Sequence, residues 1–309
     1  MTTFLQHLLN GIATGSIYAL LALGYTMVYG VLKLINFAHS DVFMIGAFSG
    51  YYAAHALGLA SNPSLPGALA VMVCSMAVCG TLGFLNERIA YRPLRGAPRI
   101  TSLITAIGVS LLLEYGGQMV FGPDPKFFPQ VFPKSNVQLG GVNTTNYQLI
   151  VVAVALALMA GLQWIVYRTR FGKAMRAVSH NFEMASLMGI PTDRVISTTF
   201  VLGSTLAAAA GCLYGLVYPK IDPLMGVFPG LKAFVAAVLG GIGNVPGAML
   251  GGMVIGLIEE YAVAVDPWAW QTLAVHVGRF KDAIVFGILV AILIFRPSGL
   301  LGRYEPEKV

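Results

Sequence analysis

Apolar runs of about 20 residues recur along the chain and limit what it can fold into. A helix needs about 20 mostly apolar residues to cross the hydrocarbon layer of a membrane. Hydrophobic residues make up 57% of the 309, and charged residues only 10%, against roughly 25% charged in an average soluble domain. The sequence therefore predicts a polytopic membrane protein. The apolar runs cover about 8–30, 42–60, 67–86, 100–120, 147–167, 195–217 and 283–296.

The form of these runs indicates helices. Lipid admits helices or a closed barrel, since no backbone polar group can stay unpaired there, and the runs lack the alternation of strands. Residues 230–265 are too long for one helix and are interrupted at "GGIGNVPG" (240–247), so we expect two spans or a broken re-entrant pair. We predict an all-α polytopic membrane protein with eight or nine transmembrane or re-entrant helices. No break in composition divides residues 1–309, which indicates a single membrane domain.

Basic residues predict the orientation of the chain. The formal charge is +6, and 12 of the 19 Lys and Arg residues fall within 88–99, 168–194 and 296–308. Such clusters beside apolar spans follow the positive-inside pattern, so we interpret them as cytosolic loops and a cytosolic C-terminus, and not as a nucleic-acid surface. The polar stretch 121–146, with its prolines and glycines, is expected outside as a structured loop without long helices.

The cytosolic stretch 168–194 contains the segment "SHNFEMASLMGIPTDR". Ser179 or Asn181 can cap a short helix, and Glu183 in its first turn suits the positive end of the helix dipole. Gly189 fits the left-handed residue that ends a helix, and a proline follows two residues later. We expect a rigid docking helix here. The alternative is an interfacial helix lying on lipid headgroups.

Beyond this short helix, Thr192 is expected to cap the next span. Lys232 is expected to reach the outer surface along its own apolar stem, and Glu259 and Glu260 are placed at the outer interface, in contact with water.

Four polar residues near or inside the spans are candidates for a substrate path: Asn36, His39, Glu114 and Asn244. A carboxylate within a membrane span is by default a functional candidate, which singles out Glu114; the alternative is a hydrogen-bonded structural acid. Asn36, Ser40 and Asp41 could instead cap the second helix of a tight turn. The glycine-rich stretch around Asn244 is interpreted first as close helix packing, with a substrate path as the alternative.

Signatures of enzymes and cofactor sites are missing. The five His show no HExxH pattern, GxSxG is absent, and no Gly-Lys-Ser/Thr phosphate loop occurs. The three Cys lie in apolar runs and suit packing. We therefore expect no catalytic residue, no metal site and no cofactor on this chain.

Several stretches together resemble one transporter family. They are "NGIATGSIYALLALGYTMVYGVLKLINFAHSDVFMIGAF", "RIAYRPLRGAPR", "FGKAMRAVSHNFEMASLMGIPTDRV", "GLKAFVAAVLGGIGNVPGAMLGG" and "PSGLLGRYEPEKV". The chain resembles, over nearly its whole length, the LivH-type permeases of ATP-binding-cassette (ABC) importers for branched-chain amino acids. Ser40 is a small departure, because glycine is expected after the Asn-Phe-Ala-His pattern.

The resemblance implies a transport subunit of the bacterial inner membrane that is not itself an enzyme. Its expected partners are a second, homologous permease, two cytosolic ATPase subunits that bind ATP and Mg, and an extracytoplasmic substrate-binding protein. The short cytosolic helix would dock on an ATPase subunit. The residues assigned to this coupling are Arg176, Asn181, Phe182, Glu183, Met184, Ala185, Leu187, Met188 and Gly189.

Two other functions stay open from the sequence. A closely related permease could carry urea or short amides, since specificity rests largely with the binding protein. An ion-coupled secondary transporter could use Glu114 as its carrier, although the cytosolic helix would then have no role.

Overall fold

A computed structural model describes residues 2–59, 62–133, 135–139, 142–264, 280–296 and 298–302. Arg303 and Lys308, two of the basic residues on which the predicted orientation of the C-terminus depends, lie outside the described residues.

Helices form nearly all of the described chain, which confirms the all-α polytopic membrane class. The α-helices are α1 (Thr2–Leu32), α2 (His39–Ala56), α3 (Leu65–Asn86), α4 (Arg99–Phe121), α5 (Asn146–Arg168), α6 (Arg170–His180), α7 (Phe182–Leu187), α8 (Thr192–Val217), α9 (Val227–Gly240), α10 (Val245–Ala264) and α12 (Lys281–Phe295). A π-helix, η1 (Glu87–Tyr91), and a 3-10 turn, η2 (Arg92–Leu94), continue α3. Among the described residues, six helices are long and apolar enough to cross a membrane, namely α1, α3, α4, α5, α8 and α10.

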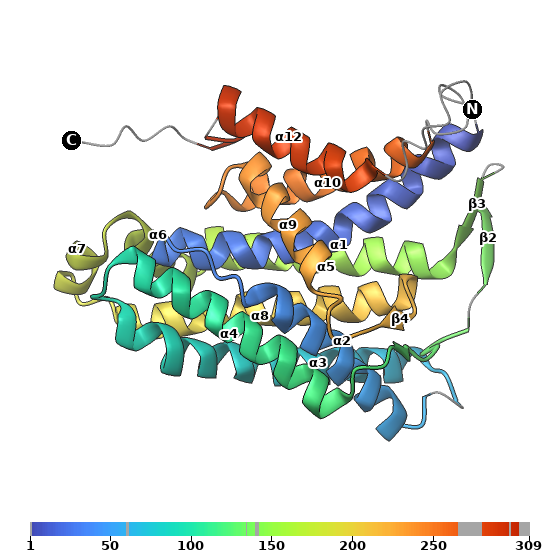
Figure 1. Cartoon of the computed structure of the whole chain (residues 1–309), viewed down its shortest axis with the longest axis horizontal. Helices are drawn as coiled ribbons and strands as arrows, with labels where there is room; N and C mark the ends of the chain where they lie inside the picture. The colour runs from blue at the N-terminus through green and yellow to red at the C-terminus, as the bar shows by residue number, and fades with distance from the viewer. Residues whose placement is uncertain are drawn as a thin grey trace.

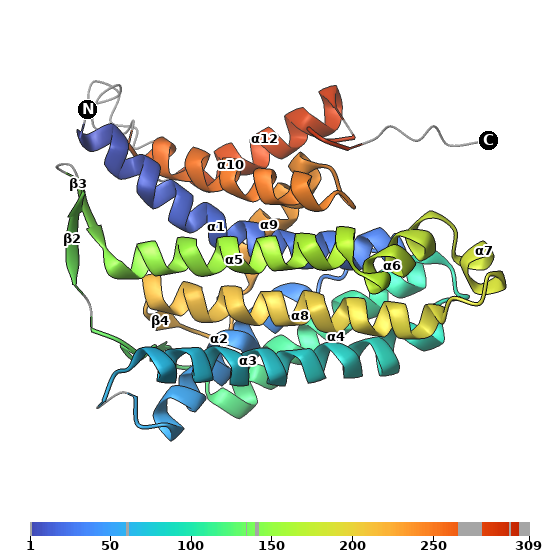
Figure 2. The ribbon, with the colours of Figure 1, turned by 180° about the vertical axis from the view of Figure 1, so that it is seen from behind.

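The α1 and α8 helices form the centre of the bundle. Most of their apolar length is buried, whereas α3, α4 and α5 expose most of theirs. Figures 1 and 2 show α10 and α12 along one side of α1, and α3 and α4 on the far side of α8. A surface that is apolar and exposed is what a lipid-facing helix requires.

Glycines let α1 and α10 approach closely. A side chain on Gly15 would meet the backbone of Met253, and one on Gly252 would meet the backbone of Ala19. Small residues at helix contacts are the usual device for close packing in lipid. The prediction of close packing in the glycine-rich stretch is thereby confirmed.

Two helices, α2 and α9, begin inside the bundle. Lys33 has φ +56 and turns the chain back at the end of α1. His39, the first residue of α2, then lies against Gly24, about 12 Å before the end of α1 at 1.5 Å per residue. Ser40 in turn packs against Gly226 and Gly230 at the start of α9. The interruption predicted in 230–265 is confirmed, since α9 ends at Gly240 and α10 begins at Val245.

The molecule has two distinct ends, which Figure 1 shows on opposite sides: one carries α7 and the other carries β2 and β3. We call them the α7 end and the β2–β3 end. β2 (Asn136–Leu139) pairs antiparallel with β3 (Val142–Thr145), and β1 (Lys126–Phe127) pairs with β4 (Lys220–Ile221). The predicted structured loop at 121–146 is confirmed.

The predicted side-chain caps of two spans are wrong. Ala38 precedes α2 without a capping side chain, and Pro191 occupies the same position before α8. The capping candidates of α2 face other groups: the Ser40 hydroxyl donates to the Phe37 carbonyl at 2.8 Å, and Asp41 accepts from Ser110 at 2.5 Å. Thr192 is the first residue of α8 and does not cap it.

Candidate functional site

The α7 helix is firmly capped at both ends, as predicted. Asn181 precedes it, and its Oδ1 accepts a hydrogen bond from the Met184 N–H at 2.9 Å. Glu183 lies in the first turn. Gly189 closes the end with φ +79, a left-handed conformation that costs glycine little. Such caps hold a short helix that could not persist alone.

One face of α7 is apolar and exposed. Leu187 is 81% exposed, Met188 beyond the helix end 82%, and Met184 61%. Phe182 is also exposed, whereas Ala185 is buried against the rest of the chain. The apolar side chains available to a partner are therefore Phe182, Met184, Leu187 and Met188, and Ala185 packs α7 against its own subunit.

The helix before α7 is anchored to the end of α5. The Thr169 hydroxyl accepts from the Gly172 N–H at 3.1 Å and so caps α6. Arg176 folds back: it donates to the Val166 carbonyl, and its guanidinium lies 5.4 Å from the centre of the Tyr167 ring. Arg176 thus braces the base of the segment that carries α7.

A cluster of charges ties the segment after α7 to the loop that follows α3. Arg95 pairs with both Glu87 and Asp193, and Arg92 also pairs with Asp193. The Ser197 hydroxyl donates to Glu87 at 2.5 Å. Glu87 is fully buried. The start of α8 is therefore fastened to η1 and η2 directly after the chain leaves α7.

Of the four predicted path residues, Asn36 and His39 adjoin, since the His39 N–H donates to the Asn36 carbonyl at 3.2 Å. Asn36 is buried, and its Oδ1 accepts from the Tyr91 hydroxyl at 2.7 Å. His39 is buried edge-on against Tyr25, with the ring centres 4.8 Å apart. Asn244 donates to the Leu301 carbonyl at 2.7 Å and accepts from the Gly247 N–H at 3.2 Å. Asn36 and Asn244 thus bond to other groups of the chain, and the assignment of all three residues to a substrate path stays a prediction.

Glu114 differs from them, because it is partly exposed within the span α4. It lies one helical turn after Ser110, whose hydroxyl donates to Asp41 of α2. Asp41, Ser110 and Glu114 therefore place polar groups where α2 and α4 meet. The proximity of Asp41 to α4 could not be read from the sequence, because 69 residues separate it from Ser110.

The predictions for Lys232 and Glu259 are wrong. Lys232 is 5% exposed and Glu259 7%, and the Lys232 Nζ lies 2.9 Å from the Glu259 carboxylate and 2.7 Å from Asp282. Lys281 also pairs with Glu259 at 2.7 Å, and the Tyr18 hydroxyl donates to the Glu259 carboxylate at 2.8 Å. Glu260 is partly buried and accepts from the Asn10 side chain at 2.9 Å. An apolar run in the sequence indicates that its residues are buried. It does not indicate which charged side chains pair there and make the burial of a charge possible, so this network could not be predicted from the sequence.

The described residues contain no group of three or more His, Cys, Asp or Glu side chains that could hold a metal ion. A bundle of apolar spans, with helices interrupted inside it and a capped helix projecting at one end, defines a multi-pass membrane protein.

Comparison with known proteins gives the family. Residues 7–293 match the family model described as "Branched-chain amino acid transport system / permease component". The chain belongs to this family: it is the permease component of a branched-chain amino acid ABC transport system. It is a transport subunit and not an enzyme, as predicted, and the ion-coupled alternative is set aside.

Individual relatives agree with the family match. The chain is 41% identical to the high-affinity branched-chain amino acid transport system permease protein BraD of Pseudomonas aeruginosa, over 99% of this chain and 98% of the relative. It is 40% identical to the permease protein LivH of Escherichia coli, with the same coverage of both chains. More distantly, it is 28% identical to the autoinducer 2 import system permease protein LsrC of Yersinia enterocolitica, over 92% of this chain and 73% of the relative.

Proposed function

We propose that α7 is the lever through which ATPase subunits drive this permease. The observation that carries the proposal is the set of exposed apolar side chains, Phe182, Met184, Leu187 and Met188, on or directly beside a helix with firm caps. Unbranched methionines adapt to the shape of a partner groove. The anchors at Arg176 and at the Glu87–Arg95–Asp193 cluster would pass a push on α7 to α5, α3 and α8.

The position of α7 favours a protein partner over lipid headgroups. Figures 1 and 2 show α7 at the tip of the molecule, past the ends of α5 and α8. A helix that binds headgroups lies in the plane of the interface, where its apolar face reaches the acyl chains. The remaining partners of the proposal are a second, homologous permease, two such ATPase subunits and an extracytoplasmic binding protein that delivers the amino acid.

A pull-down tests the lever. Leu187→Glu and Met188→Glu place a charge on the apolar face, and we expect each variant to insert in the membrane but to lose the co-purifying ATPase and transport. Lys173→Glu on exposed α6 is the matched control, because it adds the same side chain at the same end. If both α7 variants keep the ATPase and transport normally, α7 is not the lever.

We propose that the substrate passes along the face where α2, α4 and the start of α9 meet. Glu114 is partly exposed within a span, and contact between its carboxylate and acyl chains would cost free energy. Contact with a water-lined path or with a second permease would cost less. Helices that begin inside the membrane, as α2 and α9 do, commonly mark transport sites. With α2, α9 and α12 added to the six long helices, the described chain would have nine membrane segments, within the range predicted from the sequence.

Neutralising the acids tests this path. We expect Glu114→Gln and Asp41→Asn to lower transport while the complex stays assembled, because a zwitterionic amino acid would lose partners for its ammonium group. Tyr115→Phe, at the exposed neighbour of Glu114, is the control. Unchanged uptake in both acid variants would remove this face from the path.

A further inference from the structure

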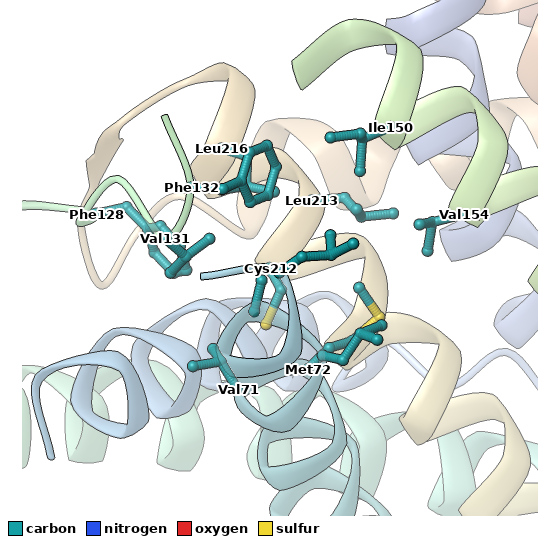
Figure 3. Close-up of a pocket in the computed structure, with 13 residues that line it drawn as sticks. Val71, Met72, Phe128, Val131, Phe132, Ile150, Val154, Cys212, Leu213 and Leu216 are labelled. Carbon is teal, nitrogen blue, oxygen red and sulfur yellow. The ribbon is translucent and has the colours of Figure 1, made fainter. Parts of the chain in front are cut away.

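An apolar hollow lies between α3 and α5, outside the lever and the proposed path. With the open space at its mouth included, it encloses about 460 Å³, and it is lined by thirteen residues, all apolar or cysteine. Figure 3 shows Met72 of α3, Val154 of α5 and Cys212 of α8 around it. α3 and α5 each pack against α8, so α8 forms the floor of the hollow and the other two helices form its walls.

The end of the hollow toward the β2–β3 end is closed by an ordered cap. Phe128 and Phe132, from the stretch between α4 and β2, line it there. The Phe128 N–H donates to the Pro219 carbonyl at 2.7 Å, and the Tyr147 hydroxyl donates to the Phe132 carbonyl at 2.6 Å. These bonds join the cap to the end of α8 and to the start of α5.

The side of the hollow is continuous with the lipid-facing surface. Leu65 and Leu69, which line it from α3, are 60% and 54% exposed. Met72 lies seven residues into α3 from Leu65, about 10 Å at 1.5 Å per residue. The hollow therefore opens onto the exposed apolar face of α3, within about 10 Å of the start of that helix.

The chemistry of the lining decides what can fill the hollow. Water does not occupy apolar cavities, which lack hydrogen-bond partners for it. A zwitterionic amino acid would leave its charged groups unpaired there. An empty hollow is unfavourable, because the atoms that line it lose van der Waals contacts. Acyl chains are the apolar material that surrounds a membrane span.

We propose that the hollow between α3 and α5 binds one acyl chain of a phospholipid from the leaflet at the β2–β3 end. The chain would pack against Cys212 and Leu216 of α8 under the cap of Phe128 and Phe132. This site is independent of the proposed lever and path.

Photolabelling tests the site. The full-length protein, with its co-purifying subunits, is reconstituted in phosphatidylethanolamine–phosphatidylglycerol vesicles that contain a phosphatidylethanolamine with a diazirine in mid-chain. We expect adducts on the peptides around Val154 and Leu216. Val154→Trp fills the hollow and should cause a several-fold loss of the adducts on the α8 peptide. Leu156→Trp, on the exposed face of the same helix, should leave them unchanged.

Further variants separate the possible outcomes. Ile150→Phe makes a smaller change and replaces Val154→Trp if that variant does not accumulate. Adducts confined to exposed helix faces, or equal labelling in the filled variants, would overturn the proposal. A photoreactive residue in place of Leu213, on the floor of the hollow, should join to lipid; its joining to another protein chain would overturn the proposal as well.

Discussion

Lys232 and Glu259 carry charges at positions almost closed to solvent, on α9 and α10. Their attraction offsets the cost of removing both from water only because the geometry is good and further partners are present. Lys232 reaches both Glu259 and Asp282, and Glu259 also accepts from the Tyr18 hydroxyl near the midpoint of α1. The network therefore fixes the interrupted helix α9 against α1, α10 and α12.

Removing one partner alone should be strongly destabilising. We expect Lys232→Met to cost up to about 3–5 kcal/mol, because the buried Glu259 keeps only Lys281 as a charged partner and Asp282 loses Lys232. In the double variant Lys232→Met/Glu259→Gln the loss should be smaller than the sum of the single losses, by about 0.5–3 kcal/mol. Thermal unfolding of the detergent-solubilised protein measures both effects. Lys220→Met, at an exposed lysine of β4, is the control and should change little; additive losses would contradict the pairing.

At the scale of elements, the segment that carries α7 depends on its attachments. α7 has six residues and cannot hold its shape by itself. The chain before it is tied to α5 through Arg176, and the chain after it is tied to η1 and η2 through Asp193. A lever transmits motion only if both of its supports are rigid.

The Glu87–Arg95–Asp193 cluster is therefore expected to couple the ATPase to transport. Arg95→Met leaves Glu87 buried without its partner, so we expect a loss of about 3–5 kcal/mol in stability and a lower transport rate per ATP hydrolysed. The exchange Glu87→Arg/Arg95→Glu should restore part of the stability and part of the transport rate per ATP hydrolysed. Arg88→Met, at an exposed arginine of the same loop, serves as control. A stable Arg95→Met variant with a normal transport rate per ATP hydrolysed would show that the cluster neither stabilises the protein nor transmits motion from the ATPase.

Hydropathy predicts the long helices well, and capping residues predict the short helix α7, although not the starts of α2 and α8. The runs 147–167 and 195–217 became Asn146–Arg168 and Thr192–Val217, and the caps of α7 followed from Asn181 and Gly189. The depth at which a helix begins inside the bundle, and the partners of the buried charged residues, could not be predicted in this way. α2 begins beside Gly24 inside the bundle, and Lys232 meets Glu259 across 27 residues and Asp282 across 50. Such pairs arise from packing, which a local pattern does not contain.

At the scale of the whole molecule, charge separates the two ends. Arg92 and Arg95 of the first basic cluster and Arg170 and Arg176 of the second lie on elements at the α7 end, which Figure 1 shows opposite the β hairpin. Because Lys and Arg in short loops stay on the cytosolic side, the α7 end is expected inside and the β2–β3 end outside. The same orientation would place α7 within reach of a cytosolic ATPase.

Thiol labelling in intact cells tests this orientation. The natural thiols lie on spans, where Cys79 and Cys212 are buried and Cys74 faces the lipid-exposed surface of α3, so a membrane-impermeant maleimide should react weakly with the parent protein. Gln130→Cys lies in the exposed loop before β2, and Ser186→Cys is exposed on α7. We expect the first variant to be labelled in intact cells and the second only after permeabilisation. An added N-terminal cysteine tests the number of spans. Nine spans place the two ends of the chain on opposite sides of the membrane, and eight place them on the same side. Because the C-terminus is predicted to be cytosolic, labelling of the N-terminal cysteine in intact cells supports nine spans. Labelling of Ser186→Cys in intact cells would reverse the orientation and remove the ATPase from reach of α7.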